Sequence, residues 1–329
     1  MLSLQRGRVT RILERAEGLV RLEVEGRPCI AYPRLTGPVS VDDEVVVNAQ
    51  ALDLGLGSGG FDVLYLNLTR GLGLAGEEGA HVMKLPYTPL QHAVRHAEED
   101  GTDDPDARLG GMPVVCCSLH SQVAPVCAGL GGELAVAYVQ LPGGALPVSL
   151  SDAVRELRRR DLLRVAVAVG ACIDGEVACV SAASALAWAA RAGMRAAVCS
   201  IGPGVAGTRT RLGHGGTAAA EAANAARALG GRAIVVPRTS EADPRERHHG
   251  LSHHTRAIIE LTLGSVSVPW PAGLAPPDVP FPLEPVEVAG WEEACDGLPL
   301  AHIGRGPSED PWFLAAAFAA GRLARTLAG

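Results

Sequence analysis

The stretch RVAVAVGACIDGEVACVSAASALAWAARAGMRAAVCSIG, residues 164–202, decides the fold. It contains two almost wholly apolar runs, VAVAV (165–169) and AAVCSI (196–201), separated by an alanine-rich segment. Runs of this kind are typical of strands that are buried on both faces of a parallel sheet. Ser181 can cap the helix between them, and Gly193 can end it. The stretch therefore predicts strands and a connecting helix of a parallel α/β sheet.

The same alternation of strands and helices is expected over the whole of 109–329. Further apolar runs are PVVCCSL (113–119), LAVAYVQ (134–140), RAIVVPR (232–238) and SVSVPW (265–270). Residues that can cap the intervening helices are Ser149 or Ser151, Thr217 and Ser252. The segment PWFLAAAFAAGRLARTL (311–327) predicts a final amphipathic helix, docked on the core or on a second subunit. We therefore predict a doubly wound, mostly parallel, Rossmann-like α/β domain.

Residues 1–70 predict a different, all-β architecture. Short segments rich in Val, Leu and Ile alternate with turn residues, and they are RVTRILERA (8–16), LVRLEVEG (19–26), CIAYPRL (29–35), DEVVVNAQAL (43–52) and FDVLYLNL (61–68). Short strands joined by turns are typical of a small β-barrel or β-sandwich. Residues 71–108 are expected to connect this domain to the α/β domain.

The overall composition excludes several classes of protein. The 329 residues carry 29 Lys and Arg against 36 Asp and Glu, and this net charge of −7 argues against a dedicated nucleic-acid binder. The long uncharged stretch 134–151 is interrupted by Pro142 and Pro147, so it is not a continuous membrane-spanning helix. The eight cysteines form no C-x-x-C pair, as expected in a reducing cytosol. We expect a cytoplasmic protein that binds neither nucleic acid nor membrane.

Candidate chemistry gathers in two loops of the predicted α/β domain. Parallel sheets bind ligands at the carboxyl ends of their strands. The loops at 202–216 and 238–255 follow two predicted strands and hold five of the ten histidines. This density, in a chain otherwise rich in Ala and Val, is the strongest indication of a functional site.

The first of these loops contains the pattern G-x-G-x-x-G at Gly202, Gly204 and Gly207, followed by Thr208. Glycines here would let the backbone approach an anion, so these four residues are expected to bind a phosphate or carboxylate. A dinucleotide is a weaker alternative, because Pro203 separates the first two glycines and Arg238 stands where the fingerprint places an acidic residue. Glycines that serve only a tight turn are the structural alternative.

Histidines in the two loops are candidates for proton transfer or metal binding. His253 and His254 are expected in the first turn of a helix, where the dipole lowers the pKa of an imidazole and favours its neutral form. His214 would join them from the preceding loop, and His120 and Asp243 could complete the set. Histidines that only brace the loops through hydrogen bonds are the alternative. The sequence leaves the metal status open.

Basic side chains could hold the anion in place. Arg238, Arg245 and Arg247 offer planar donors that suit a carboxylate or phosphate. Arg245 and Arg247 flank Glu246, so ion pairing within the loop is the alternative. Lys84, the only lysine of the chain, is a further candidate for an anion contact.

Three segments resemble a bacterial family that is catalogued only as a domain of unknown function. They are MKLPYTPLQ (83–91), GPGVAGTRTRLGHGG (202–216) and ADPRERHHGLSHHT (242–255), and the similarity covers nearly the whole chain. The position of Arg209 is usually a small residue in that family, so the resemblance gives Arg209 no role. The resemblance implies no activity, substrate or cofactor.

Three functions fit these observations. The favoured one is binding of a small anionic metabolite at the carboxyl edge of the sheet, as a hydrolase or transferase with histidine acid/base or metal chemistry. The alternatives are a non-catalytic ligand-binding or sensor protein and a NAD(P)- or flavin-dependent oxidoreductase. The sequence assigns no cofactor. The expected partners are a small anionic molecule and, through the final helix, a second copy of the chain in a homodimer.

Overall fold

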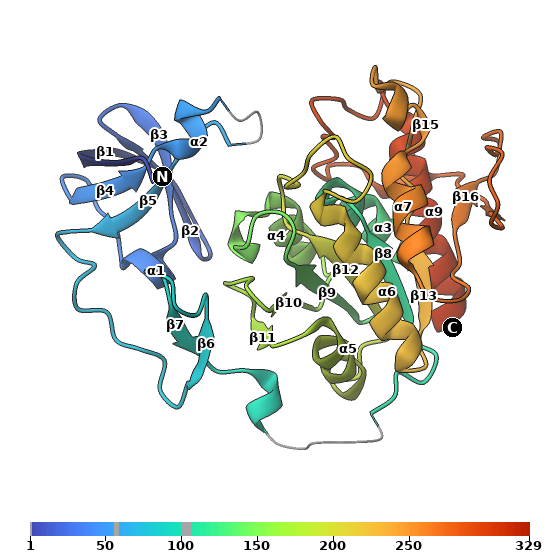
Figure 1. Ribbon diagram of the computed structural model, residues 1–329, viewed down its shortest axis with the longest axis horizontal. Coiled ribbons are helices and arrows are strands. Elements are labelled where there is room, and N and C mark those ends of the chain that lie inside the picture. The colour runs from blue at the N-terminus through green and yellow to red at the C-terminus, as the bar shows by residue number, and fades with distance from the viewer. Residues whose placement is uncertain (1, 56–58, 101–106) are drawn as a thin grey trace. The chain divides into compact units, whose positions relative to one another are not determined.

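The computed structural model describes residues 2–55, 59–100 and 107–329. The chain divides into two compact units, Met1–Arg95 and His96–Gly329 (Figure 1). The boundary at Arg95 divides the predicted connecting region 71–108 between the two units. Residues 101–106 of that region lie outside the described part of the chain.

The first unit contains the closed β-barrel that the sequence predicts as one of two alternatives. Its five strands follow one another around the barrel in the order β1-β2-β3-β5-β4. The strands are β1 Leu4–Ala16, β2 Leu19–Val24, β3 Arg27–Ala31, β4 Glu44–Asn48 and β5 Asp62–Asn67. The shorter elements are α1 Pro33–Thr36, α2 Gln50–Asp53, β6 Val82–Lys84 and β7 His92–Val94. Val9, Leu22 and Val45 are fully buried, so the barrel has a hydrophobic core of its own.

The second unit is built on a six-stranded parallel sheet with the strand order β11-β10-β9-β12-β8-β13. The strands are β8 Pro113–Cys117, β9 Val136–Leu141, β10 Val165–Val169, β11 Val177–Cys179, β12 Ala196–Ile201 and β13 Arg232–Val235. Every residue of β8, β9, β10 and β12 is buried, as their uninterrupted apolar runs predict. The short edge strand β11 is the one strand of this sheet that the sequence analysis did not identify.

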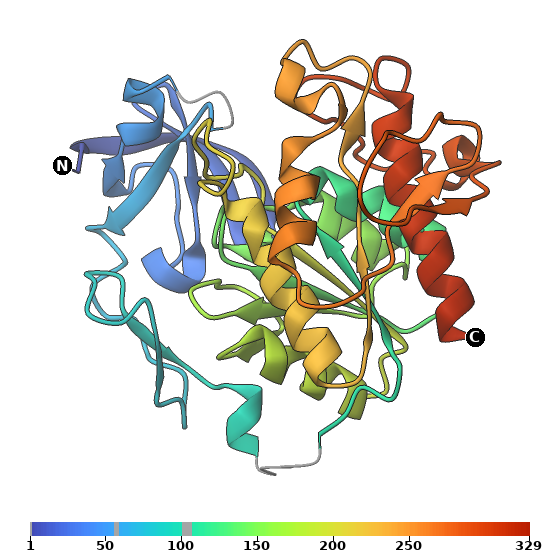
Figure 2. The same ribbon diagram turned by 45° about the vertical axis from the view of Figure 1, so that its right-hand side comes forward.

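Helices cover both faces of the sheet (Figure 2). One face packs against α3 Val123–Leu130, α4 Asp152–Arg159 and α9 Pro311–Ala328. The other face packs against α5 Ala182–Arg191, α6 Ala218–Ala228 and α7 His253–Leu261. Most of the side chains that face the sheet from α5 and α6 are alanines, which let these helices lie close to it. The predicted two-sided α/β architecture is therefore present.

The strand order differs from that of a dinucleotide-binding domain. Numbered from β8 as the first strand, the order β11-β10-β9-β12-β8-β13 reads 4-3-2-5-1-6, whereas the dinucleotide-binding order is 3-2-1-4-5-6. Both sheets reverse their winding in the middle, where β8 and β12 lie side by side in this chain. The sheet therefore resembles that of a dinucleotide-binding domain in having helices on both faces, but not in its strand order.

Side-chain caps start the helices largely where the sequence predicts them. The hydroxyls of Ser151, Ser181 and Ser252 accept hydrogen bonds from amides in the first turns of α4, α5 and α7. Thr217 differs, because its hydroxyl donates to the carbonyl of His214 instead of capping α6. The cap at Ser252 makes His253 the first residue of α7, as expected.

The helices α3 and α9 are in unusually close contact because each has a glycine at the crossing. A Cβ atom placed on Gly321 of α9 would lie 2.0 Å from the carbonyl oxygen of Val126. A Cβ atom on Gly129 of α3 would lie 2.3 Å from the carbonyl oxygen of Phe318. The predicted docking of the final helix on the core is therefore confirmed.

The remaining elements are short. They are β14 Thr239–Ser240, β15 Gly250–Leu251, β16 Pro269–Pro271, β17 Glu284–Val286, α8 Trp291–Ala294 and the 3-10 helices η1 Ala97–Asp100, η2 His120–Gln122, η3 Val148–Leu150, η4 Gly215–Thr217 and η5 Glu246–His248. Within the described ranges, no helix combines the length and the apolar character needed to cross a membrane.

Candidate functional site

Three neighbouring strands bring the candidate residues to one edge of the sheet. β12, β8 and β13 are adjacent and parallel, so the segments that follow them leave from the same edge. His120 follows β8, His214 lies beyond β12, and Arg238 follows β13. These residues therefore lie at the carboxyl edge of the sheet, where the sequence places them. Each of them makes different contacts there.

The loop after β13 is folded back on itself by a two-residue ribbon. Thr239–Ser240 pairs antiparallel with Gly250–Leu251, and the amide of Ser252 donates to the carbonyl of Arg238 at 2.9 Å. The amide of Arg238 donates in turn to the hydroxyl of Thr255 at 2.9 Å. These bonds hold Arg238 against the first turn of α7.

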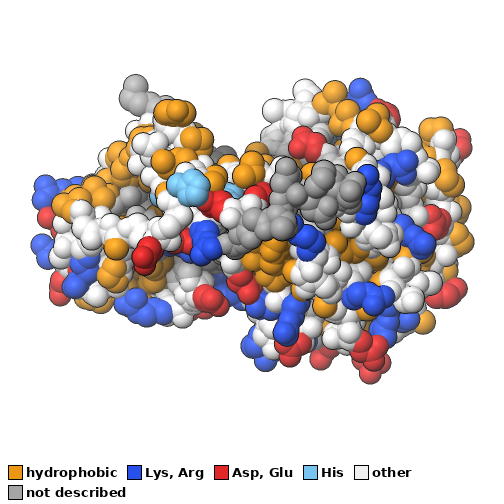
Figure 3. All heavy atoms as spheres, turned by 90° about the horizontal axis from the view of Figure 1, so that it is seen from below, with side chains coloured by type: hydrophobic (Ala, Val, Ile, Leu, Met, Phe, Trp, Pro, Cys, Tyr) orange, Lys and Arg blue, Asp and Glu red, His pale blue; other side chains and the backbone are white. Residues whose placement is uncertain are grey.

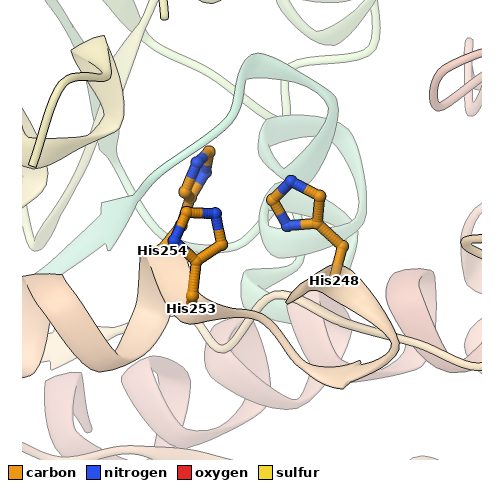
Figure 4. A group of neighbouring side chains, drawn as sticks. All are labelled: His248, His253 and His254. Atoms are coloured by element: carbon orange, nitrogen blue, oxygen red, sulfur yellow. The ribbon is translucent and has the colours of Figure 1, made fainter. Parts of the chain in front are cut away.

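Four histidines from three segments form one cluster at this place. The rings of His214 and His254 stack, with centroids 3.6 Å apart and 13° between their planes. The rings of His248 and His253 lie 4.9 and 4.5 Å from the ring of His254. Figure 4 shows His253 and His254 side by side at the start of α7, with His248 opposite them. Three of the four are predicted from the sequence, whereas His248 is not.

The hydrogen bonds of the cluster leave several ring nitrogens unpaired. His248 Nδ1 lies 2.7 Å from Ser252 Oγ, and Arg238 Nη1 donates to His254 Nδ1 at 3.2 Å. Nε2 of His253 and both ring nitrogens of His214 are buried and have no hydrogen-bond partner among the described residues. Buried polar atoms are normally paired, so these nitrogens are suited to receiving a ligand, an ion or a water molecule.

Burial keeps these histidines neutral at neutral pH. Burial, together with His214 and Arg238, lowers the pKa of His254 to about 2. Burial, together with Arg238, lowers the pKa of His248 to about 3. Burial is also the main cause that lowers the pKa values of His214 and His253. Neutral imidazoles can accept a proton or bind a metal ion.

Asp243 is the centre of an arginine network beside the histidines, and its side chain is fully buried. Arg245 donates through Nε and Nη2 to its two carboxylate oxygens at 2.8 and 2.7 Å. Arg238 and Arg305 reach its Oδ2 atom at 3.5 and 3.4 Å. Burial alone would raise the pKa of Asp243, but the hydrogen bonds from Arg245 and the charges of Arg245 and Arg238 hold it well below its usual range. The predicted proton-transfer role would require these ion pairs to break.

The segment before α9 contributes residues that sequence reasoning missed. Arg305 Nε and Ser240 Oγ both donate to Oδ2 of Asp310, at 3.1 and 2.6 Å. His302 Nδ1 lies 2.9 Å from Ser121 Oγ, while its Nε2 is buried without a partner in the described part of the chain. The one sequence feature that could have indicated them is the presence of four titratable residues within 302–310, immediately before the final helix.

The network carries more positive than negative charge. Among the described residues that form it, three arginines (Arg238, Arg245 and Arg305) meet two carboxylates (Asp243 and Asp310), which leaves a formal excess of one positive charge. Arg238 is 2% exposed, and burial lowers its pKa to about 10. Its Nε atom is buried and has no partner among the residues that the structure describes. On the face drawn in Figure 3, by contrast, acidic and basic side chains are interspersed over the larger unit.

His120 has partners of its own. Its Nε2 lies 2.6 Å from Ser151 Oγ, and its Nδ1 lies 3.3 Å from both the carbonyl oxygen of Ile201 and the hydroxyl of Tyr138. Burial lowers the pKa of His120 to about 4. These contacts connect β8, β9, β12 and the cap of α4, which is the bracing role that the sequence analysis kept as an alternative.

The glycine loop packs tightly against the turn that follows β9. A Cβ atom on Gly202 would lie 2.1 Å from the carbonyl oxygen of Ala145, so the backbone contact alone requires glycine there. Gly204 has a positive φ of 73° and is exposed, and Gly207 pairs with His214 in an isolated bridge. The turn alternative therefore accounts for Gly202 and Gly204.

Two backbone amides of the glycine loop, those of Ala206 and Thr208, are bonded within the protein. The amide of Ala206 donates to the carbonyl of Gly143 at 3.0 Å, and the amide of Thr208 donates to that of Gly213 at 2.7 Å. Amides that are used in this way are not presented to a phosphate. The anion contact predicted for this loop, and the dinucleotide alternative, gain no support from its geometry and stay predictions.

Two further basic candidates lie apart from the cluster or at its margin. Arg247 belongs to η5 and is exposed, and its charge helps burial to lower the pKa of His253. Lys84 ends β6 in the first unit and is buried. Since the histidines and arginines of the cluster all belong to the second unit, an anion contact of Lys84 stays a prediction.

Among the residues that the structure describes, one group of three has the geometry to hold a metal ion. The candidate ligand atoms of His248, His253 and His254 all lie within 4.8 Å of one another. Asp243 is engaged by arginines, so it is not placed to join them.

A family model matches residues 28–277, which include all three of the segments that carry the resemblance. The chain belongs to the family described as Protein of unknown function (DUF3866). The matched region contains the four histidines and the network residues Arg238, Asp243 and Arg245. The other two residues of the network, Arg305 and Asp310, lie beyond it, as does His302. No curated protein matches this sequence. The family therefore defines the chain without assigning it a reaction.

Proposed function

We propose that the protein binds a small anionic metabolite, bearing phosphate or carboxylate, beside Arg238 and Arg305 at the carboxyl edge of the parallel sheet. The observation that carries this proposal is the unbalanced positive charge of the buried network. A buried guanidinium is costly unless it is paired and hydrogen-bonded. Arg238 meets Asp243 only at 3.5 Å, and its Nε atom has no partner in the described part of the chain. An anion would supply both the missing charge and the missing acceptor.

Other unpaired groups support binding at the same place. His302 is buried, and its pKa is lowered to about 3 by burial and by the nearby charges of Arg238 and Arg305. Its Nε2 atom, like that of His253, is without a partner among the described residues. A neutral imidazole offers an anion a donor from one nitrogen and can accept a proton at the other.

The finer proposal is a hydrolase or transferase in which a histidine moves a proton. His253 and His214 are neutral and have buried, unpaired nitrogens, which a general base requires. Arginines that orient the anion would hold it against these nitrogens, as expected of a positioned substrate. Binding without turnover would favour the alternative of a ligand-binding or sensor protein.

The proposal is tested by thermal unfolding of the chelator-treated protein with inorganic phosphate, sulfate and acetate. A bound anion stabilises the folded state by mass action, and an anion at a hundred times its Kd adds about 2.7 kcal/mol. We expect a saturable rise in Tm with at least one of these anions, which Arg305→Gln reduces.

The matched control is Arg232→Gln, because Arg232 is exposed and starts β13 at the opposite edge of the sheet. This variant should retain the full rise in Tm. A protein that none of the three anions stabilises, or an equal response of the Arg305 and Arg232 variants, would refute binding at the network.

A further inference from the structure

We infer that His248, His253 and His254 form a binding site for one divalent transition-metal ion. Their candidate ligand atoms lie within 4.8 Å of one another. Two of the three side chains come from the first turn of α7, and the third comes from the segment that Ser252 joins to that turn. The three rings face one another in Figure 4, so modest rotations would bring their nitrogens to one ion.

The nitrogens of His248 and His253 are available to an ion. Nδ1 of His248 is 2.7 Å from Ser252 Oγ, which leaves Nε2 for a metal if Nδ1 donates to the hydroxyl. Metal-binding histidines commonly donate their second N–H to a neighbouring oxygen in this way. Nε2 of His253 is buried and lacks a partner within the described part of the chain. A buried nitrogen without a hydrogen-bond partner is free to bind a metal ion.

His254 couples the metal site to Arg238. A guanidinium can only donate, so His254 Nδ1 accepts from Arg238 and the neutral ring carries its proton on Nε2. A metal on either nitrogen of His254 therefore requires Arg238 to give up this 3.2 Å contact. In the structure His254 is therefore bonded to Arg238, and a metal ion would compete with Arg238 for the His254 ring.

The chemistry of the ligands selects the class of metal. Three neutral imidazoles suit Zn²⁺, Co²⁺, Ni²⁺, Cu²⁺ or Fe²⁺, whereas Mg²⁺ and Ca²⁺ prefer oxygen ligands. Three histidines also leave a further coordination position for water or substrate, as in catalytic zinc sites. The ring of His214 stacks on that of His254, with centroids 3.6 Å apart, so a fourth imidazole lies beside these three.

This inference deepens the proposed function because it concerns the same cluster. A divalent ion adds positive charge beside an arginine network that already has an excess of it. Metal binding should therefore be tighter when an anion is present, and the anion should bind more tightly to the metal-loaded protein, since linkage is reciprocal. Failure of the anion proposal can be distinguished from failure of the metal inference. The anion test above is made without metal, and the metal test below is made without added phosphate or sulfate.

The test is a Co²⁺ titration of the full chain, freed of affinity tag and stripped with chelator. Calorimetry gives the stoichiometry and Kd, and the visible absorption of bound Co²⁺ reports its coordination. We expect one ion per chain, with binding roughly tenfold or more weaker in His248→Ala and His253→Ala. His249→Ala is the control, since His249 is exposed beside the same segment and should leave the Kd unchanged.

Two results would overturn the inference. One is the absence of saturable Co²⁺ binding by the folded chain, and the other is an unchanged Kd in both ligand variants. If either alanine variant fails to fold, His253→Gln and His248→Asn serve in its place. Arg238→Met tests the competition directly, because it should tighten Co²⁺ binding, and an unchanged or weaker Kd in a folded Arg238→Met protein would refute the displacement of Arg238.

Discussion

At the scale of single residues, the site depends on one buried carboxylate that holds three arginines. Asp243 has no exposed side-chain surface and is approached by Arg238, Arg245 and Arg305. Its negative charge is therefore the main reason that a guanidinium can be buried at Arg238. The sequence identified Asp243 and two of these arginines, but the printed order of residues does not show that Arg305 meets them, because this contact spans 62 positions.

Replacing Asp243 by Asn should destabilise the second unit by about 3 kcal/mol, because it leaves buried arginines without their shared counter-charge. Urea unfolding monitored by circular dichroism measures this loss. Glu241→Gln is the control, since Glu241 is exposed two positions away and should change the free energy of unfolding by no more than about 0.5 kcal/mol. Equal effects of the two substitutions would show that Asp243 does not carry this role.

His120 should make the stability of the protein depend on pH between about 6.5 and 4. Its folded-state pKa is lowered to about 4 by burial, so the unfolded chain binds its proton first as the pH falls. Stability from this residue is therefore complete above the unfolded pKa and declines as the pH drops towards 4, by up to about 3 kcal/mol. Denaturant unfolding at several pH values should show a shallower decline in His120→Gln than in the unmodified chain, and parallel profiles would contradict the assignment.

At the scale of elements, apolar runs predict the sheet and glycines decide its closest contact. The strands at 113–117, 136–141 and 165–169 are visible in the sequence because burial on both faces demands uninterrupted apolar residues. β11 is not visible, because it pairs over only three residues at the edge of the sheet. The role of Gly321 is equally hidden, since it depends on which helix lies opposite.

Gly321→Ala should destabilise the α3–α9 contact, although alanine ordinarily favours a helix by about 1 kcal/mol over glycine. The new Cβ would lie 2.0 Å from the carbonyl oxygen of Val126, so the helices would have to separate at a cost of about 3 kcal/mol. Chemical unfolding measures the difference. Gly76→Ala, which meets no atom within 4 Å, should be nearly neutral, and a neutral Gly321→Ala would mean that the crossing is looser than described.

At the scale of the whole molecule, the site is assembled from segments that no local pattern connects. The sequence predicts the edge at which the candidate residues gather, because the carboxyl ends of parallel strands share one edge of a sheet. It does not reveal that His248 turns towards α7, that Ser252 both caps α7 and contacts His248, or that the segment 302–310 closes the network. These contacts depend on tertiary packing. The glycine pattern at 202–207, from which an anion site is predicted, is explained in part by packing against the turn after β9.

The two compact units should unfold in two separate transitions, because each has its own hydrophobic core. Phosphate or another bound anion should raise the Tm of the transition that belongs to the second unit and leave that of the barrel unchanged. Differential scanning calorimetry with and without anion measures both. A barrel transition that also rises, and rises less in Lys84→Met, would instead support the predicted contact of Lys84 with the anion.

The position of α9 has a consequence for the order of events during synthesis. Residues of α9 complete the hydrophobic layer over one face of the sheet, and Arg305 and Asp310 immediately before it complete the arginine network. A nascent chain that has released all six strands from the ribosome still exposes the part of that face which α9 covers, and it lacks both charges. The arginine network therefore assembles only after α9 has left the exit tunnel, so a ribosome that stalls before this point yields a chain in which the network is incomplete.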